Sequence, residues 1–67
     1  MADIERLNEA IDKSGMTMTA VAIRSGIVRE TLYNRINGIG EFKASEIQGL
    51  AKALKLSNKE RDQIFFK

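Results

Sequence analysis

The chain has 67 residues and a formal net charge of +2, and it contains neither cysteine nor histidine. This length fits one domain with a core that supplies about 3–5 kcal/mol of net stability at most, and the missing residue types exclude disulfides, thiol chemistry and the common zinc sites. No apolar run approaches the roughly 20 residues of a membrane span, so we expect a soluble cytoplasmic protein with no metal, no other cofactor and no membrane partner.

The charge is unevenly distributed along the chain. Residues 1–12 hold one arginine against four carboxylates, a net charge of −3, so the remaining residues carry +5. A basic body fits a polyanionic partner through counterion release. Many soluble proteins without such a partner have a similar balance, so charge alone favours nucleic acid only slightly.

The first helix is predicted from about Asp3 to Ser14, with Gly15 as its stop. Its apolar stripe consists of Ile4, Leu7 and Ile11. Met16 then leads into Thr17, a residue type that caps helix N-termini well. We expect Met16 and Met18 to pack at the entry of the second helix rather than to form a cofactor site.

Residues 17–38 predict two short helices joined by a sharp bend. Ala22 lies on the inner face of the first, about residues 18–25, and is small enough to let a second helix cross closely. Gly26 can adopt positive φ at no steric cost, which a tight helix C-terminus needs. Ile27 follows as an apolar plug, so the stretch has the outline of a helix-turn-helix.

The second helix of this pair is predicted over about residues 28–37, with Leu32 and Ile36 four residues apart on its inner face. Asn37-Gly38 ends it, because these residue types are the usual left-handed C-caps. An Asn-Gly pair also suits a hairpin turn, but the flanks lack the alternation of strands, so we prefer the cap. The side chains expected to face outward are Arg29, Glu30, Tyr33 and Asn34.

The remainder predicts a loop and two more helices. Ile39 and Phe42 are expected to fold back onto the core from the loop. Residues 45–48 have the form of a capping box that starts a fourth helix, and residues 57–60 form a second one that opens a last helix to about Phe65. The fourth helix is expected to bury Ile47, Leu50, Ala51 and Leu54. The chain is therefore predicted to be all-α, with five helices.

The spacing of five residues in the central stretch, followed by the helix LAKAL at 50–54, resembles the phage repressor and Cro-like helix-turn-helix (XRE-type) family over about residues 4–56. The five residues are Ala22, Gly26, Ile27, Leu32 and Gly38. Residues 31–38, 40–42 and 64–66 are similar to small prophage regulators. The resemblance implies a compact lambda-repressor-like domain over residues 1–67 that binds double-stranded DNA as a homodimer and takes no small-molecule substrate.

In this family the second helix of the motif lies in the major groove and the first crosses the backbone. The resemblance implies base contacts at Val28, Arg29, Glu30 and Asn34. Tyr33 either reaches a base or phosphate or lies half-buried with its hydroxyl at the surface. Phosphate contacts are implied at Thr17, Thr19, Asn37 and Lys43.

The apolar tail Ile64, Phe65 and Phe66 is the candidate dimer contact. Two adjacent aromatic residues cannot both face one core from a single helix. One of them is therefore either covered by the loop at Phe42 or available to a second subunit. The alternative, that the whole tail belongs to the core of one chain, stays open.

The chain departs from the family pattern at three positions. Val28 stands where the family usually has a Ser or Thr N-cap, so the second helix of the motif starts less firmly or Val28 touches a thymine methyl. Met18 replaces a Gln that often binds phosphate, and Arg35 replaces an apolar residue, with Ile36 apolar instead. The helix is therefore expected to be slightly rotated or prolonged, which affects the base contact of Asn34 more than that of Arg29.

The function expected from these patterns is that of a sequence-specific transcriptional regulator. Its outward polar residues also fit an ordinary solvated helix face, and Glu30 mildly favours a protein-interaction module, such as an antitoxin-like or adaptor domain. An enzyme is not expected, because the chain lacks His and Cys and has no phosphate-cradling loop of the GxxxxGK[ST] form.

Overall fold

The computed structural model describes residues 2–66, which form five helices joined by short turns. They are α1 (Ile4–Ser14), α2 (Met18–Ser25), α3 (Arg29–Ile36), α4 (Ala44–Ala53) and α5 (Asn58–Phe65). No strand occurs between residues 2 and 66, so the prediction of an all-α chain with five helices is confirmed. The Cα radius of gyration is 10.4 Å, close to the value of about 11 Å expected for a compact chain of this length.

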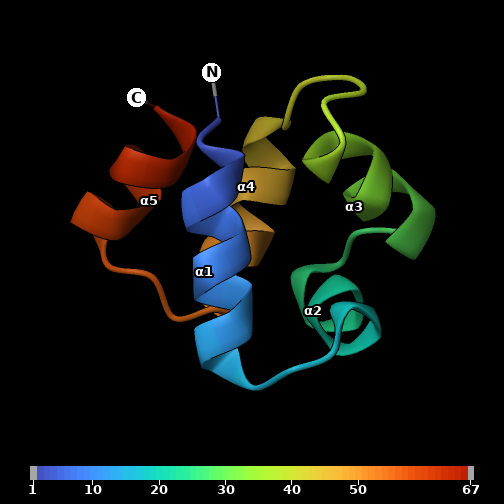
Figure 1. Cartoon of the computed structure of the whole chain (residues 1–67), viewed down its shortest axis with the longest axis horizontal. Coiled ribbons are helices and arrows are strands. Elements are labelled where there is room, and N and C mark those ends of the chain that lie inside the picture. The colour runs from blue at the N-terminus through green and yellow to red at the C-terminus, as the bar shows by residue number, and fades with distance from the viewer. Residues whose placement is uncertain (1, 67) are drawn as a thin grey trace.

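The helices are arranged around a central pair. α1 and α4 lie in the middle, α5 flanks them on one side, and α2 and α3 occupy the other side (Figure 1). The backbone N–H of Asp3 donates to the carbonyl of Ile64 at 2.6 Å, which ties the start of α1 to the end of α5. Gly15 ends α1 with φ of 71°, as its glycine predicts.

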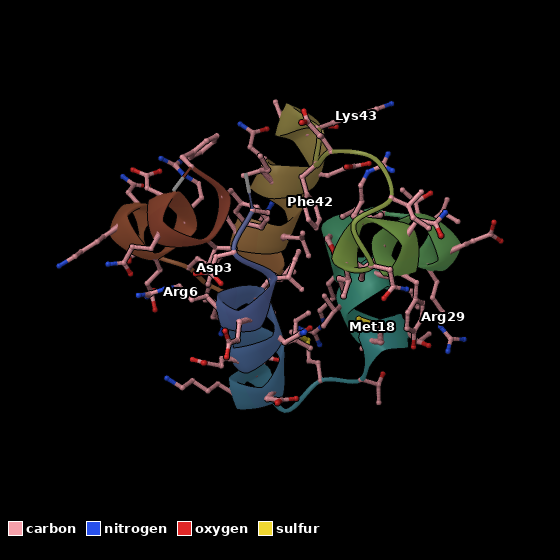
Figure 2. The ribbon with its side chains drawn as sticks, turned by 45° about the horizontal axis from the view of Figure 1, so that its top comes forward. Asp3, Arg6, Met18, Arg29, Phe42 and Lys43 are labelled. Atoms are coloured by element: carbon pink, nitrogen blue, oxygen red, sulfur yellow. The ribbon has the colours of Figure 1, made fainter. Side chains whose placement is uncertain are left out.

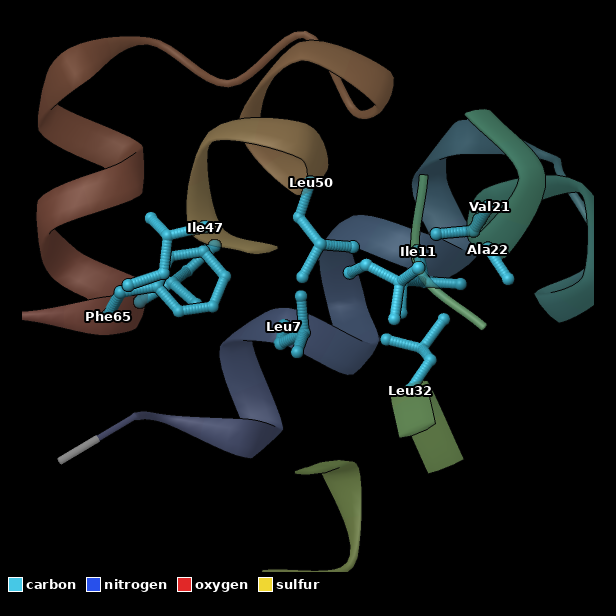
Figure 3. Close-up of a cluster of buried hydrophobic side chains, with 10 residues drawn as sticks. Leu7, Ile11, Val21, Ala22, Leu32, Ile47, Leu50 and Phe65 are labelled. Atoms are coloured by element: carbon cyan, nitrogen blue, oxygen red, sulfur yellow. The ribbon is translucent and has the colours of Figure 1, made fainter. Parts of the chain in front are cut away.

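The core takes one fully buried side chain from each of the first four helices, namely Leu7, Val21, Leu32 and Leu50. The α5 helix adds Ile64 and Phe65, and the cluster is completed by Ile11, Ala22, Ile27 and Ile47 (Figure 3). Ala51 and Leu54, both predicted to be buried, are only half-buried, although Leu54 still packs against the core. This shared cluster fixes how α3 is presented at the surface.

The predicted start of α4 at Ser45 is wrong. The helix begins at Ala44, with Lys43 as its N-cap, and Ser45 is exposed in its first turn. The Lys43 backbone N–H donates to Oε1 of Glu46 at 2.9 Å. The same oxygen lies 3.3 Å from Nε of Arg35, so an arginine from α3 holds the carboxylate at the helix start.

α2 and α4 cross in close backbone contact at Gly49. A Cβ atom on Gly49 would overlap the carbonyl oxygen of Ser25 and come within 3.0 Å of its carbonyl carbon. Ser25 is itself buried, and its hydroxyl donates to the carbonyl of Val21. The crossing therefore requires a residue without a side chain on α4 and a small one on α2.

The loop before α4 behaves differently at its two apolar residues. Phe42 folds back as predicted and meets Phe65 edge to face, with ring centroids 5.2 Å apart. Ile39 was expected to do the same, but 61% of its surface is exposed. It lies in the turn that follows Gly38, whose φ is 84°.

The capping box predicted at the start of α5 is confirmed. The hydroxyl of Ser57 accepts from the backbone N–H of Glu60 at 3.1 Å, and the Glu60 carboxylate accepts from the backbone N–H of Ser57 at 2.8 Å. The hydrogen bond from the Ser57 backbone, followed by that with its side chain, lowers the pKa of Glu60 from its ordinary value of 4.5.

The hydrogen bonds between Ser57 and Glu60 make the free energy of unfolding depend on pH. Since the pKa of Glu60 is lower in the folded than in the unfolded state, its contribution is complete above about pH 4.5 and is lost as the pH falls through the folded value. We expect Glu60→Gln to show a smaller loss of stability than the unchanged protein between pH 7 and about pH 3.5, measured by urea unfolding. The control is Glu41→Gln, which removes an exposed carboxylate from the loop before α4. Equal acid sensitivity of the unchanged protein and Glu60→Gln would contradict the argument.

Within residues 2–66, every helix is too short or too polar to cross a membrane.

Candidate nucleic-acid interface

The turn between α2 and α3 is built around Gly26. Its φ of 72° is left-handed, and its backbone N–H donates to the carbonyls of Ala22 and Ile23. The N–H of Ile27 then donates to the carbonyl of Ala22 at 3.0 Å, and the Ile27 side chain is buried as the predicted plug. These bonds close α2 within two residues and let α3 leave at a fixed angle.

α3 packs on the core through Leu32 and, less completely, through Ile36. Leu32 has no exposed surface and is the one buried residue of the helix, while Ile36 is half-buried. Val28 is the N-cap, and its side chain makes no capping hydrogen bond, as the missing Ser or Thr predicts. The helix is therefore short, held from one side and open on the other.

The residues predicted to contact bases lie on the open side of α3, with one qualification. Val28, Arg29, Glu30 and Tyr33 are exposed, whereas Asn34 is half-buried. Asn34 therefore offers less of its side chain to a partner than the other four residues. Arg29 points away from the body of the protein (Figure 2).

Arg29 and Tyr33 contact each other one turn apart. The guanidinium carbon of Arg29 lies 5.3 Å from the centroid of the Tyr33 ring, within the range of a cation–π interaction. Tyr33 is 39% exposed, so its ring is at the surface and partly covered. Arg29 makes no ion pair with any residue from 2 to 66, which leaves its charge available.

The residues predicted to contact phosphates are all exposed and lie on three elements. Thr17 caps α2, where its hydroxyl oxygen accepts from the N–H of Ala20 at 3.1 Å, and Thr19 follows in the first turn. Asn37 ends α3 and Lys43 begins α4. Figure 2 places Arg29 and Lys43 toward opposite ends of the half of the molecule that holds α3.

Arg35 has a structural role that the sequence did not reveal. Its Nε lies 3.3 Å from the Glu46 carboxylate, and its Nη1 donates to the carbonyl of Ile39 at 3.1 Å. A Cβ atom on Gly40 would overlap the same guanidinium. Arg35 thus joins the end of α3, the loop and the start of α4, and its charge is used within the protein.

The apolar tail divides between core and surface. Ile64 and Phe65 are buried in the monomer, so neither can touch a second chain in this fold. Phe66 is 61% exposed, and the Arg61 guanidinium lies 6.0 Å from its ring centroid. Of the three predicted dimer contacts, Phe66 alone has the exposure that a partner needs.

No family model, curated protein or solved structure matches this chain. The residues from 2 to 66 also contain no cluster of three acidic side chains that could hold a metal ion. The α2–α3 unit, meaning residues 17–38 with their exposed polar side chains, is the candidate functional site.

Proposed function

We propose that this protein is a sequence-specific DNA-binding regulator whose α2–α3 unit is a helix-turn-helix of the phage repressor and Cro-like type. α3 would enter the major groove, with α2 crossing the sugar–phosphate backbone. The observation that carries the proposal is the pairing of a buried inner side at Leu32 with an open outer side at which Arg29 has no ion pair within residues 2–66. A cation in that position suits a base edge.

Each exposed residue of α3 has a matching base chemistry. Arg29 can donate two parallel hydrogen bonds to O6 and N7 of guanine, and Val28 can contact a thymine methyl. Glu30 can accept from cytosine N4 or orient Arg29, and Asn34 can pair with adenine where a small rotation exposes it. These contacts would set the operator sequence.

Positioning would come from the surrounding polar groups. The hydroxyls of Thr17 and Thr19, the Asn37 amide and the Lys43 ammonium are exposed and suited to phosphate oxygens. They contribute affinity that falls with salt but no base preference. Operator affinity would therefore combine a few specific contacts on α3 with backbone contacts from three elements.

The resemblance extends the proposal to a cytoplasmic homodimer of the kind encoded by phages and prophages. Two copies related by a two-fold axis would bind half-sites about one helical turn apart, with Phe66 as the exposed apolar residue at the contact. Bound to a promoter, such a dimer would act sterically by excluding or recruiting polymerase, and protein concentration would set its occupancy.

The test is selection of duplexes from a random pool at near-physiological salt, with Arg29→Ala in parallel. We expect a two-fold symmetric motif, and we expect Arg29→Ala to lose about 1–3 kcal/mol of binding free energy and to relax one position of the motif. The control is Lys59→Ala, which removes one exposed positive charge on α5, away from α3. If both variants lost the same binding free energy, Arg29 would contribute only through its positive charge and would not read a base.

A protein-interaction module is the second candidate. Ile23 on α2 is 75% exposed and Val28 at the start of α3 is 71% exposed, and phosphates repel the exposed carboxylate of Glu30. Exposed aliphatic groups beside a carboxylate suit a protein surface better than DNA. If the folded protein enriches no duplex at micromolar concentrations, this candidate takes precedence.

A further inference from the structure

The contact between Arg29 and Tyr33 is a feature of the free protein. The two residues are separated by one helical turn, so their side chains are neighbours on the same side of α3. The guanidinium carbon lies 5.3 Å from the ring centroid. Because the contact forms without DNA, it can pre-organise Arg29 before binding.

The contact restricts the long arginine side chain without using its hydrogen-bonding capacity. The face of an aromatic ring attracts a guanidinium that lies over it, and this contact uses none of the five N–H donors of the arginine. A free arginine loses considerable rotamer entropy when it is fixed by a ligand. An arginine already held on a ring loses less, which raises affinity through pre-organisation.

Within residues 2–66, the ring of Tyr33 is the side chain that restrains the guanidinium of Arg29. Glu30 is adjacent to Arg29 in sequence, and residues one apart on a helix do not face each other. No carboxylate from residues 2 to 66 forms an ion pair with Arg29. The Tyr33 hydroxyl likewise makes no hydrogen bond within the described residues that would assign it a structural task.

We propose that Tyr33 is a positioning residue that holds Arg29 with its donor edge toward the groove and so strengthens the preference for guanine at the base pair that Arg29 reads. The inference rests on the proposed DNA-binding function. It assigns Tyr33 an indirect role: the ring acts on the base through Arg29, and the hydroxyl is not needed.

Two substitutions separate the ring from the hydroxyl. Tyr33→Phe keeps the aromatic face, and Tyr33→Leu removes it while keeping an apolar side chain. The readout is the ratio of affinities for the selected operator and for the same duplex with A·T in place of the G·C pair that Arg29→Ala relaxes. We expect Tyr33→Phe to keep this ratio and Tyr33→Leu to lower it about two- to fivefold, the effect of an exposed cation–π contact.

A double substitution tests whether Tyr33 acts through Arg29. In the Arg29→Ala background, Tyr33→Leu should cause no further change in the base preference, because there is no guanidinium left to position. An equal decrease in both backgrounds would overturn the proposal and indicate that Tyr33 acts on DNA by itself. A loss of affinity for every duplex alike, with the ratio unchanged, would reduce Tyr33 to a structural residue.

Nuclear magnetic resonance of the free protein provides a readout that does not depend on DNA. The δ-methylene and Nε protons of Arg29 should be shifted upfield by the Tyr33 ring current, and Tyr33→Leu should abolish this shift while thermal unfolding confirms that the variant is folded. If the wild type selects an operator but Tyr33→Leu keeps its guanine preference, the positioning role fails and the regulator stands. If the wild type selects no duplex, both proposals fail together.

Discussion

Replacing Leu32 with alanine should reduce the free energy of unfolding by about 2–5 kcal/mol. That is comparable to the entire stability of a domain of this size, roughly 3–5 kcal/mol. Leu32 has no exposed surface and is the one buried residue that attaches α3 to the core cluster (Figure 3). The cavity left by its side chain would both weaken the core and release α3.

Urea unfolding followed by two probes would measure this. The chain has one tyrosine and no tryptophan, so its tyrosine emission reports on α3 through Tyr33, while far-ultraviolet circular dichroism reports on all helices. We expect Leu32→Ala to lower both midpoints. The control is Ile23→Ala, which shortens an aliphatic side chain that is exposed on α2 and should change stability by about 0.5 kcal/mol or less. Similar losses in the two variants would refute the attachment of α3 through Leu32.

Gly49→Ala should also destabilise the protein, although helix propensity predicts the opposite. Alanine in a helix interior is favoured over glycine by about 1 kcal/mol. Here its methyl group would overlap the Ser25 carbonyl oxygen, and because that oxygen is backbone, no side-chain rearrangement can relieve the clash. Overpacking of this kind costs about 1–3 kcal/mol and occasionally more, so after the propensity gain of about 1 kcal/mol we expect a net loss of up to about 2 kcal/mol.

Thermal unfolding shows directly whether Gly49→Ala raises or lowers the stability of the protein. A loss of about 2 kcal/mol corresponds to a decrease in Tm of roughly 10 °C for a domain of this length. Gln48→Ala changes the adjacent exposed position of α4 and should leave Tm nearly unchanged. A higher Tm for Gly49→Ala would mean that propensity outweighs the close crossing of α2 and α4.

Local signals in the sequence were sufficient to predict the five helices and most of the residues at which they begin and end. Gly15 and Gly26 have the left-handed φ predicted for them, and Thr17 and Ser57 accept the capping hydrogen bonds that their residue types suggest. Each of these features involves atoms only a few residues apart. Such geometry repeats from protein to protein, so the residue type alone predicts it.

The start of α4 could not be predicted because it depends on a distant residue. Ser45 has the better capping side chain, yet the structure uses the Glu46 carboxylate, which Arg35 holds from the end of α3. The requirement for Gly49 is similarly invisible in the sequence, since it arises only where α2 and α4 cross. Both the start of α4 and the need for glycine at position 49 therefore depend on contacts between helices that are far apart in the sequence.

The candidate interface was predictable as a set of exposed positions but not as an arrangement. Helical periodicity correctly placed Arg29 and Glu30 on the outer side of α3. The spacing of Arg29 and Tyr33 also permitted their contact, but helical periodicity alone could not show that the contact forms. Whether these residues bind DNA remains the prediction that operator selection tests.

The bond between Asp3 and Ile64 has a consequence for the order of the helices along the chain. It brings the start of α1 and the end of α5 together, on the side of the molecule away from α3 (Figure 1). A short linker could therefore join them, with new ends opened at exposed Lys55, whose φ of 55° is unfavourable for a side-chain-bearing residue. The chain would then run from α5 through α1 to α4 around the same core. A circular permutant of this kind would retain the α2–α3 unit and the crossing at Gly49 as uninterrupted segments.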